Sequence, residues 1–224
     1  MLSGTERNRK DKKVKKLHII VGSTRDGRAA EPVAQWVHRR AKEHGGFDVT
    51  LLDLRDWPLP MFAETMATIG DFASPTYSDP IVRRWNQTIA EGDAFIFITP
   101  EYNHSFSGVL KNAIDSVFVS WAFRNKPAAF VAYSGGPVGG ARAVEQLALV
   151  LIEAEMVPLR NTVLIAAAHA AFDDYAQPTN PQTDVALEIL LEDLAWWSDA
   201  TVAARAAGEL TPGTMRFRAA VAVA

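Results

Sequence analysis

The fold is decided by the stretch Leu17–Arg28, which reads L-H-I-I-V-G-S-T-R-D-G-R. Its first residues are apolar and partly β-branched, which is typical of a short strand buried on both faces of a sheet. At Gly22 the pattern changes to hydroxyls and arginines, so a polar loop is expected where the strand leaves the sheet. Apolar residues then recur at helical spacing as far as His44, which predicts a helix that begins near Gly27.

This polar loop has the chemistry of an anion-binding site. The first backbone N–H groups of the following helix would point back into the loop, and the helix dipole favours negative charge there. Hydroxyls and guanidinium groups add further hydrogen bonds, from Ser23, Thr24, Arg25 and Arg28. The loop therefore predicts a phosphate site, with a solvated turn carrying surface arginines as the alternative.

Strand and helix patterns alternate along the rest of the chain. The further strands are expected over residues 47–54, 93–99, 127–134 and 157–166, and the further helices over 81–91, 109–118, 141–155 and 181–207. The last helix is capped by Asn180, with Pro181 at its first position. This alternation predicts a doubly wound α/β fold: a five-stranded parallel sheet in the order 2-1-3-4-5, with helices on both faces.

The predicted topology also predicts where a ligand would bind. In a doubly wound sheet, ligands lie beyond the carboxyl ends of the strands, where the strand order reverses. Here that point lies between the first and third strands. The third strand leads into Pro100-Glu101-Tyr102-Asn103, and the fourth into a turn that begins Ser134-Gly135-Gly136. With the first loop they suit a flat heterocycle carrying one phosphate, although the glycines could also be simple turn residues.

Charge and length indicate one domain with two extensions. Residues 1–16 hold 7 basic and 2 acidic residues, whereas the remainder holds 16 basic and 24 acidic residues. The basic segment lacks aromatic residues and an apolar face, so we expect a disordered leader and no nucleic-acid or membrane partner. The domain is then expected over residues 17–207, with a C-terminal tail over 208–224.

Several function classes are disfavoured by missing motifs. A G-x-G-x-x-G dinucleotide fingerprint, a Walker loop and a G-x-S-x-G elbow are all absent, and the five histidines lack metal-ligand spacing. No cysteine is present, so a disulfide or thiolate site is excluded and a cytoplasmic location is expected. We predict no catalytic side chain and no metal. Glu101 could be a base, a hydrogen-bonding group or a solvated carboxylate.

An irregular segment over residues 55–80 contains four prolines. Its apolar cluster Trp57–Phe62 would be costly to leave in water, so it is expected either to pack on the domain as a lid or to meet a partner subunit.

The motifs together resemble the NADPH-dependent FMN reductases of the flavodoxin-like superfamily, which include related quinone and azo-dye reductases. The resemblance covers residues 17–155, in the family's order. It rests on Gly22-Ser23-Thr24-Arg25 with Arg28, on Leu59-Pro60, on Pro100–Asn103 followed by Gly108–Asp115, and on Ser134-Gly135-Gly136. The two ends of the chain match no motif of the family.

This resemblance implies a flavodoxin-like fold and an FMN cofactor. The FMN phosphate would be bound by Ser23, Thr24, Arg25 and Arg28. The isoalloxazine ring would be lined by Pro100, Glu101, Tyr102 and Asn103, and contacted on its far side by Ser134, Gly135 and Gly136. The resemblance further implies NADPH as hydride donor and a homodimer or homotetramer with the flavin near a subunit boundary.

The expected function is hydride transfer from NAD(P)H to bound FMN, and then to a small acceptor such as free flavin, a quinone or an azo compound. A flavodoxin-like electron carrier without NADPH activity is the first alternative, disfavoured by the arginines of the first loop. A flavin-free protein that binds a partner through Trp57–Phe62 is the second.

Overall fold

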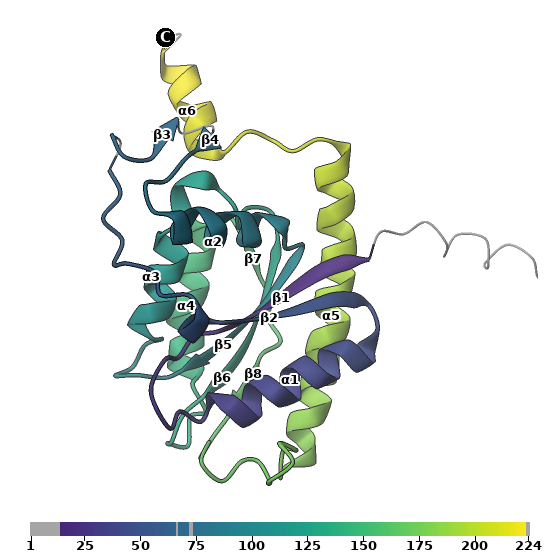
Figure 1. Ribbon diagram of the computed structural model, residues 1–224. Helices are drawn as coiled ribbons and strands as arrows, with labels where there is room; N and C mark the ends of the chain where they lie inside the picture. Colours follow the sequence, from purple (N-terminus) through teal and green to yellow (C-terminus); the bar gives the residue numbers. More distant parts are fainter. Residues whose placement is uncertain (1–13, 66, 72–73, 223–224) are drawn as a thin grey trace, which may run out of the picture.

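The computed structural model describes residues 14–65, 67–71 and 74–222, and its centre is a parallel sheet (Figure 1). The sheet has six strands in the order β2-β1-β5-β6-β7, with β8 also paired to β6. The strands are β1 (Lys15–Val21), β2 (Phe47–Asp53), β5 (Ala94–Pro100), β6 (Pro127–Tyr133), β7 (Val157–Pro158) and β8 (Val163–Ile165). The α/β class is as predicted, but the prediction of five strands is wrong.

The difference arises in the expected fifth strand. β7 pairs with the first two residues of β6 and β8 with the last three, so residues 159–162 stand opposite only two residues of β6. Such an excess on one strand is a bulge, which interrupts the ladder. Leu159 still donates its backbone N–H to the Ala128 carbonyl at 2.8 Å, and pairing with β6 resumes only at Val163. Within this bulge the side-chain amide of Asn161 donates to the Asp193 carboxylate of α5 at 2.5 Å. One continuous pattern therefore forms two strands.

Helices cover both faces of the sheet, as predicted (Figure 1). One face carries α1 (Ala30–His44) and α5 (Pro181–Ala207), and the other carries α2 (Pro80–Glu91), α3 (Gly108–Asp115) and α4 (Ala141–Glu153). Successive side chains of a strand point to opposite faces. Accordingly, Ile19 of β1 packs in the core beneath α1 and α5, while Ile20 packs in the core beneath the other three helices.

Several boundaries differ from the expected ones. Residues 1–13 of the expected leader lie outside the described residues, and β1 already begins at Lys15, whose ammonium group pairs with Asp199 of α5 at 2.8 Å. The expected tail contains α6 (Gly213–Ala222), and the irregular segment contains a small antiparallel pair, β3 (Gly70–Asp71) and β4 (Ser74–Pro75). Two short 3₁₀ helices, η1 (Leu54–Asp56) and η2 (Phe118–Ser120), follow β2 and α3. No described helix is both long and apolar enough to span a membrane.

The apolar cluster Trp57–Phe62 packs only in part against the domain. The Trp57 ring meets the Trp85 ring of α2 edge-on at 4.9 Å between centroids. The Asn112 amide of α3 donates to the Pro60 carbonyl at 2.9 Å and accepts from the Phe62 N–H at 2.8 Å. The side chains of Met61 and Phe62 nevertheless remain exposed.

Candidate functional site

Three loops meet in one hollow at the carboxyl ends of the strands. The loop after β1 contributes Arg25 and Arg28, the loop after β5 contributes Glu101 and Tyr102, and the loop after β6 contributes Gly135. The sheet order explains this convergence, because β1 lies beside β5 and β5 lies beside β6. The hollow measures about 240 Å³, and it is also lined by Gly27, Ala29, Pro100, Tyr133, Ser134, Ala168 and His169.

Four of the predicted site residues do not line this hollow. Ser23 is fully buried behind it, with its hydroxyl 2.9 Å from the hydroxyl of Tyr102. Thr24 lines a neighbouring groove beside Leu59 and Val109. Asn103 adopts a left-handed backbone (φ 49°) in the turn after β5, and Gly136 is exposed beyond Ser134.

The start of α1 offers free hydrogen-bond donors. The residue that precedes this helix, Ala29, has no side chain able to cap the first N–H groups, and no side-chain cap is formed there. Such a helix end favours an anion. The Arg25 guanidinium carbon lies 5.4 Å from the centre of the Tyr102 ring, and Arg25 forms no ion pair with any described residue. Both features are suited to a phosphate group.

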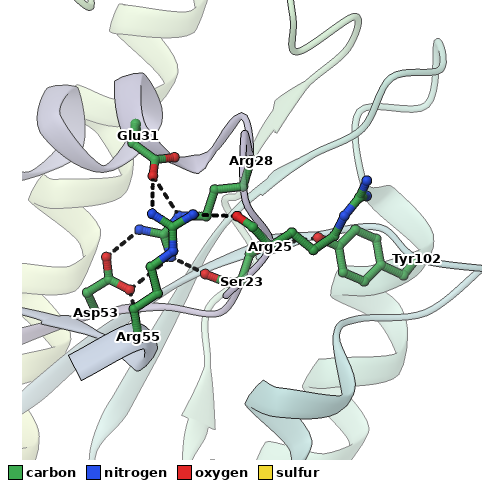
Figure 2. A network of polar contacts seen from close by, with 7 residues as sticks. All are labelled: Ser23, Arg25, Arg28, Glu31, Asp53, Arg55 and Tyr102. Atoms are coloured by element: carbon green, nitrogen blue, oxygen red, sulfur yellow. Dashed lines mark hydrogen bonds and ion pairs between the residues drawn. The ribbon is translucent and has the colours of Figure 1, made fainter. Parts of the chain in front are cut away.

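Arg28, by contrast, is engaged within the protein (Figure 2). Its guanidinium donates to both carboxylate oxygens of Asp53, with 2.8 Å between Nη1 and Oδ1, and its Nε donates to Glu31 at 3.0 Å. It also donates to the Ser23 carbonyl. Four of the five N–H donors of an arginine are therefore committed. Arg28 braces the loop from behind.

A second arginine completes this brace. Arg55 of η1 donates to Glu31 at 2.7 Å and to the Arg25 carbonyl (Figure 2). Burial by itself would raise the pKa of Asp53, but hydrogen bonds from Arg28 and from the Arg55 backbone N–H outweigh it and lower that pKa. The hydrogen bond to Asp53 raises the pKa of Arg28 in turn. The loop is thus held by three ion pairs, Arg28 with Asp53, Arg28 with Glu31 and Arg55 with Glu31.

Glu101 forms part of the hollow wall, and its buried carboxylate pairs with an arginine that is 41% exposed. The Glu101 side chain is 4% exposed, and Oε1 accepts from Nη2 of Arg142 in α4. Arg142 also donates to Nδ1 of His104 at 3.2 Å. The second carboxylate oxygen, Oε2, has no hydrogen-bond partner among the described residues. The sequence left three interpretations of Glu101 open, and the one in which its carboxylate is solvated is therefore wrong.

Tyr133 adds a buried polar group to the same hollow. The residue is 5% exposed, and its hydroxyl has no hydrogen-bond partner in the part of the chain that the structure describes. Burial raises the pKa of this hydroxyl above its ordinary value. Unpaired buried polar groups are uncommon and often mark the place of a bound molecule or water.

Sequence reasoning missed six residues that line the hollow or hold its loops. These residues are Glu31, Asp53, Arg55, Tyr133, Arg142 and His169. A usable signal existed for Asp53 and Tyr133, because each is the last residue of a strand that ends at the same edge of the sheet. Across residues 14–65, 67–71 and 74–222, no cluster of His, Asp or Glu could hold a metal ion.

Comparison with known proteins gives one consistent family. The family described as NADPH-dependent FMN reductase matches residues 15–170. A similar protein is the NAD(P)H-dependent FMN reductase PA1204 of Pseudomonas aeruginosa, 33% identical over 160 residues, which cover 68% of this chain and 79% of that protein. Another is the NAD(P)H-dependent FMN reductase C4B3.06c of Schizosaccharomyces pombe, 36% identical over 132 residues. That match covers 59% of this chain and 63% of the S. pombe protein, so this chain spans less than two thirds of the length of that relative.

Solved structures agree with this result. The flavoenzyme NAD(P)H:(acceptor) oxidoreductase FerB of Paracoccus denitrificans is 25% identical, with a TM-score of 0.67 over 84% of this chain and 99% of that one. An archaeal flavodoxin, 13% identical with a TM-score of 0.53, shares the fold.

Proposed function

The chain belongs to the NADPH-dependent FMN reductase family, and from that premise we propose that it transfers hydride from NAD(P)H to FMN in the hollow and onward to a small acceptor. The observation that carries this proposal is the convergence of the loops after β1, β5 and β6 in one hollow. An anion site, an aromatic wall and a glycine turn are the three parts that a phosphorylated flat ring needs.

The residues present fit FMN. In this proposal Arg25 and the uncapped N–H groups of α1 hold the phosphate, and Arg28 keeps their loop in shape while offering its remaining donor. Ser23 supports Tyr102 from behind the hollow, and Thr24 lines the neighbouring groove. Residues 100–102 and 134–135 line the ring. A side chain carbon added at Gly135 would meet nothing within 4 Å, so the loop leaves space there. The unpaired Tyr133 hydroxyl gives the ligand a polar partner.

Bound FMN would supply the hydride chemistry, and the protein supplies binding and electrostatics. No side chain is assigned a proton-transfer step. The backbone N–H of Gly135 in this turn would donate to an oxygen or nitrogen atom at the ring edge, where preorganised dipoles stabilise developing negative charge.

The proposed acceptor is a quinone, with free flavin and azo compounds as alternatives. Relatives named for this chemistry support it: a quinone reductase of Pseudomonas putida, 32% identical over 142 residues, and a 2-hydroxy-1,4-benzoquinone reductase of a Burkholderia species, 31% identical over 135 residues. A preference for NADPH over NADH rests on the family description alone.

We propose a homodimer or homotetramer with the flavin near the subunit boundary. Exposed apolar side chains beside the site support this assembly, namely Met61, Phe62 and Val109. Ultracentrifugation at several protein concentrations would measure the oligomeric state.

A cytoplasmic location is proposed from composition, and cell fractionation would test it.

Anaerobic spectroscopy tests the activity. Purified protein loaded with FMN should lose the yellow flavin absorption when NADPH is added, and a quinone should restore it. If only a chemical reductant bleaches the flavin, the electron-carrier alternative holds. Protein that neither contains nor takes up FMN would contradict both flavin functions.

A further inference from the structure

We propose that Arg142 is a positioning residue that acts through Glu101: it cancels the charge of a carboxylate buried in the hollow wall and so allows the site to hold FMN in its reduced, more negative form. This inference rests on the proposed function, because it concerns the redox state of the bound cofactor. It assigns a role to a residue that lies outside the predicted site motifs.

The first observation is the burial of the carboxylate. The Glu101 side chain is 4% exposed, its Oε1 accepts from Arg142, and its Oε2 has no hydrogen-bond partner among the described residues. A buried charge is tolerated only when a partner compensates it, and removal of one partner of such a pair is strongly unfavourable. Arg142 is the cation that the structure places against Glu101.

The second observation is the position of the cation. Arg142 stands in the first turn of α4, where the helix dipole disfavours positive charge, and the preceding Gly140 provides no side-chain cap. Helix stability therefore does not account for an arginine here. Its hydrogen bonds lead out of the helix to Glu101 and to Nδ1 of His104, both in the loop after β5. The arginine serves that loop.

The consequence concerns charge at the ring. With the pair intact, this part of the wall carries no net charge. Without Arg142, an unpaired carboxylate whose side chain is only 4% exposed would face the hollow, and it would repel a further negative charge there. Binding of reduced FMN should then weaken more than binding of oxidised FMN.

The test compares the dissociation constants of oxidised and reduced FMN, the latter under anaerobic conditions. Arg142→Met should weaken the binding of reduced FMN about tenfold more than that of oxidised FMN, which lowers the two-electron potential of the bound cofactor by about 30 mV. Arg142→Lys keeps the charge and should remain near wild type. Glu101→Gln should have the opposite effect and lower the ratio of the dissociation constant of reduced FMN to that of oxidised FMN. The double variant Glu101→Gln/Arg142→Met should return this ratio towards the wild-type value.

Arg205→Met is the matched control, because it removes an ion pair with Asp93 (2.8 Å) at the other end of β5 and should leave the ratio unchanged. Equal weakening of both redox forms in Arg142→Met, without recovery in the double variant, would overturn the inference. If Arg142→Met does not fold, an unchanged ratio in Glu101→Gln overturns it. Wild-type protein that binds no FMN refutes the proposed function and this inference with it, whereas FMN binding with unchanged ratios refutes the inference alone.

Discussion

At the scale of single residues, the two arginines of the loop after β1 have different surroundings. Arg25 lies beside the Tyr102 ring at the hollow, whereas Arg28 donates hydrogen bonds to Asp53 and Glu31 (Figure 2). The sequence shows two equivalent cations three residues apart. The structure shows one available for a ligand and one committed to the loop.

Replacement of Arg25 tests this division. Arg25→Met should weaken FMN binding about thirtyfold, because a charge-assisted hydrogen bond contributes about 2 kcal/mol. Binding of riboflavin, which lacks the phosphate, should hardly change. Arg40→Met, at a partly exposed arginine that pairs with Glu43 at 3.1 Å, is the control. If Arg25→Met weakens the binding of FMN and of riboflavin equally, Arg25 does not bind the phosphate.

Replacement of Asp53 tests the brace by its pH dependence. Because the pKa of Asp53 is lowered in the folded protein, its carboxylate form stabilises the fold above the ordinary carboxyl pKa, and this contribution is lost as the pH falls through the lowered value. Asp53→Asn should therefore be less stable than wild type at pH 7, and the difference should shrink below about pH 4. Urea unfolding at several pH values measures it. A difference that does not vary with pH would refute the brace.

The sequence predicted most of the hollow's own residues but few of their partners. The loop ends of β1, β5 and β6 follow from local patterns and strand order. Pairs such as Arg28 with Asp53, or Glu101 with Arg142, join residues 25 and 41 positions apart, and no periodicity relates them. Only the folded chain reveals that Arg28 is already occupied.

At the scale of elements, β1 carries a buried titratable side chain, His18. Burial, with contributions from Lys126 and Lys16, lowers its pKa to about 4. The unfolded chain therefore binds a proton at a higher pH than the folded chain does. The free energy of unfolding should therefore fall by about 3 kcal/mol as the pH falls from about 6.5 to about 4. Above about pH 6.5 this contribution of His18 is fully present.

Unfolding of His18→Leu measures this contribution. Between pH 7 and pH 4, the variant should lose about 3 kcal/mol less unfolding free energy than wild type does, because leucine takes up no proton. If the unfolding free energies of the two proteins fall in parallel with pH, His18 has the same pKa in the folded and the unfolded protein, and the prediction is wrong.

The contact between α3 and the apolar cluster Trp57–Phe62 gives a second test at this scale. Asn112→Ala leaves the Pro60 carbonyl and the Phe62 N–H without their partner, which should cost about 2 kcal/mol and speed proteolysis near Met61. Lys111→Ala, which removes a surface pair with Asp115 in the same helix, should cost less than about 1 kcal/mol. Equal effects of the two variants would contradict the proposed anchoring.

Element prediction succeeded where a pattern was continuous and failed where pairing decided the outcome. The strands β1, β2, β5 and β6 lie within two residues of their expected bounds. The expected strand over 157–166 was split because residues 159–162 form a bulge opposite only two residues of β6. The pair β3 and β4 has only two residues in each strand, too few for a periodic signal.

At the scale of the whole molecule, the strand order determines the site. β1 lies between β2 and the central strand β5, so its carboxyl end opens between loops that are distant in sequence. This is the point where the strand order reverses, the usual ligand position in doubly wound sheets. The sequence predicted this crevice because alternating strands and helices restrict the topology to few arrangements.

A crystal structure of the chain with FMN bound is the most direct test of the central claim that these three loops form one flavin site. We predict the phosphate at the start of α1 within hydrogen-bond distance of Arg25, and the ring between Tyr102 and Gly135. FMN found instead in the groove lined by Leu59, Val109 and Asn112, with the hollow free of ligand, would contradict the account.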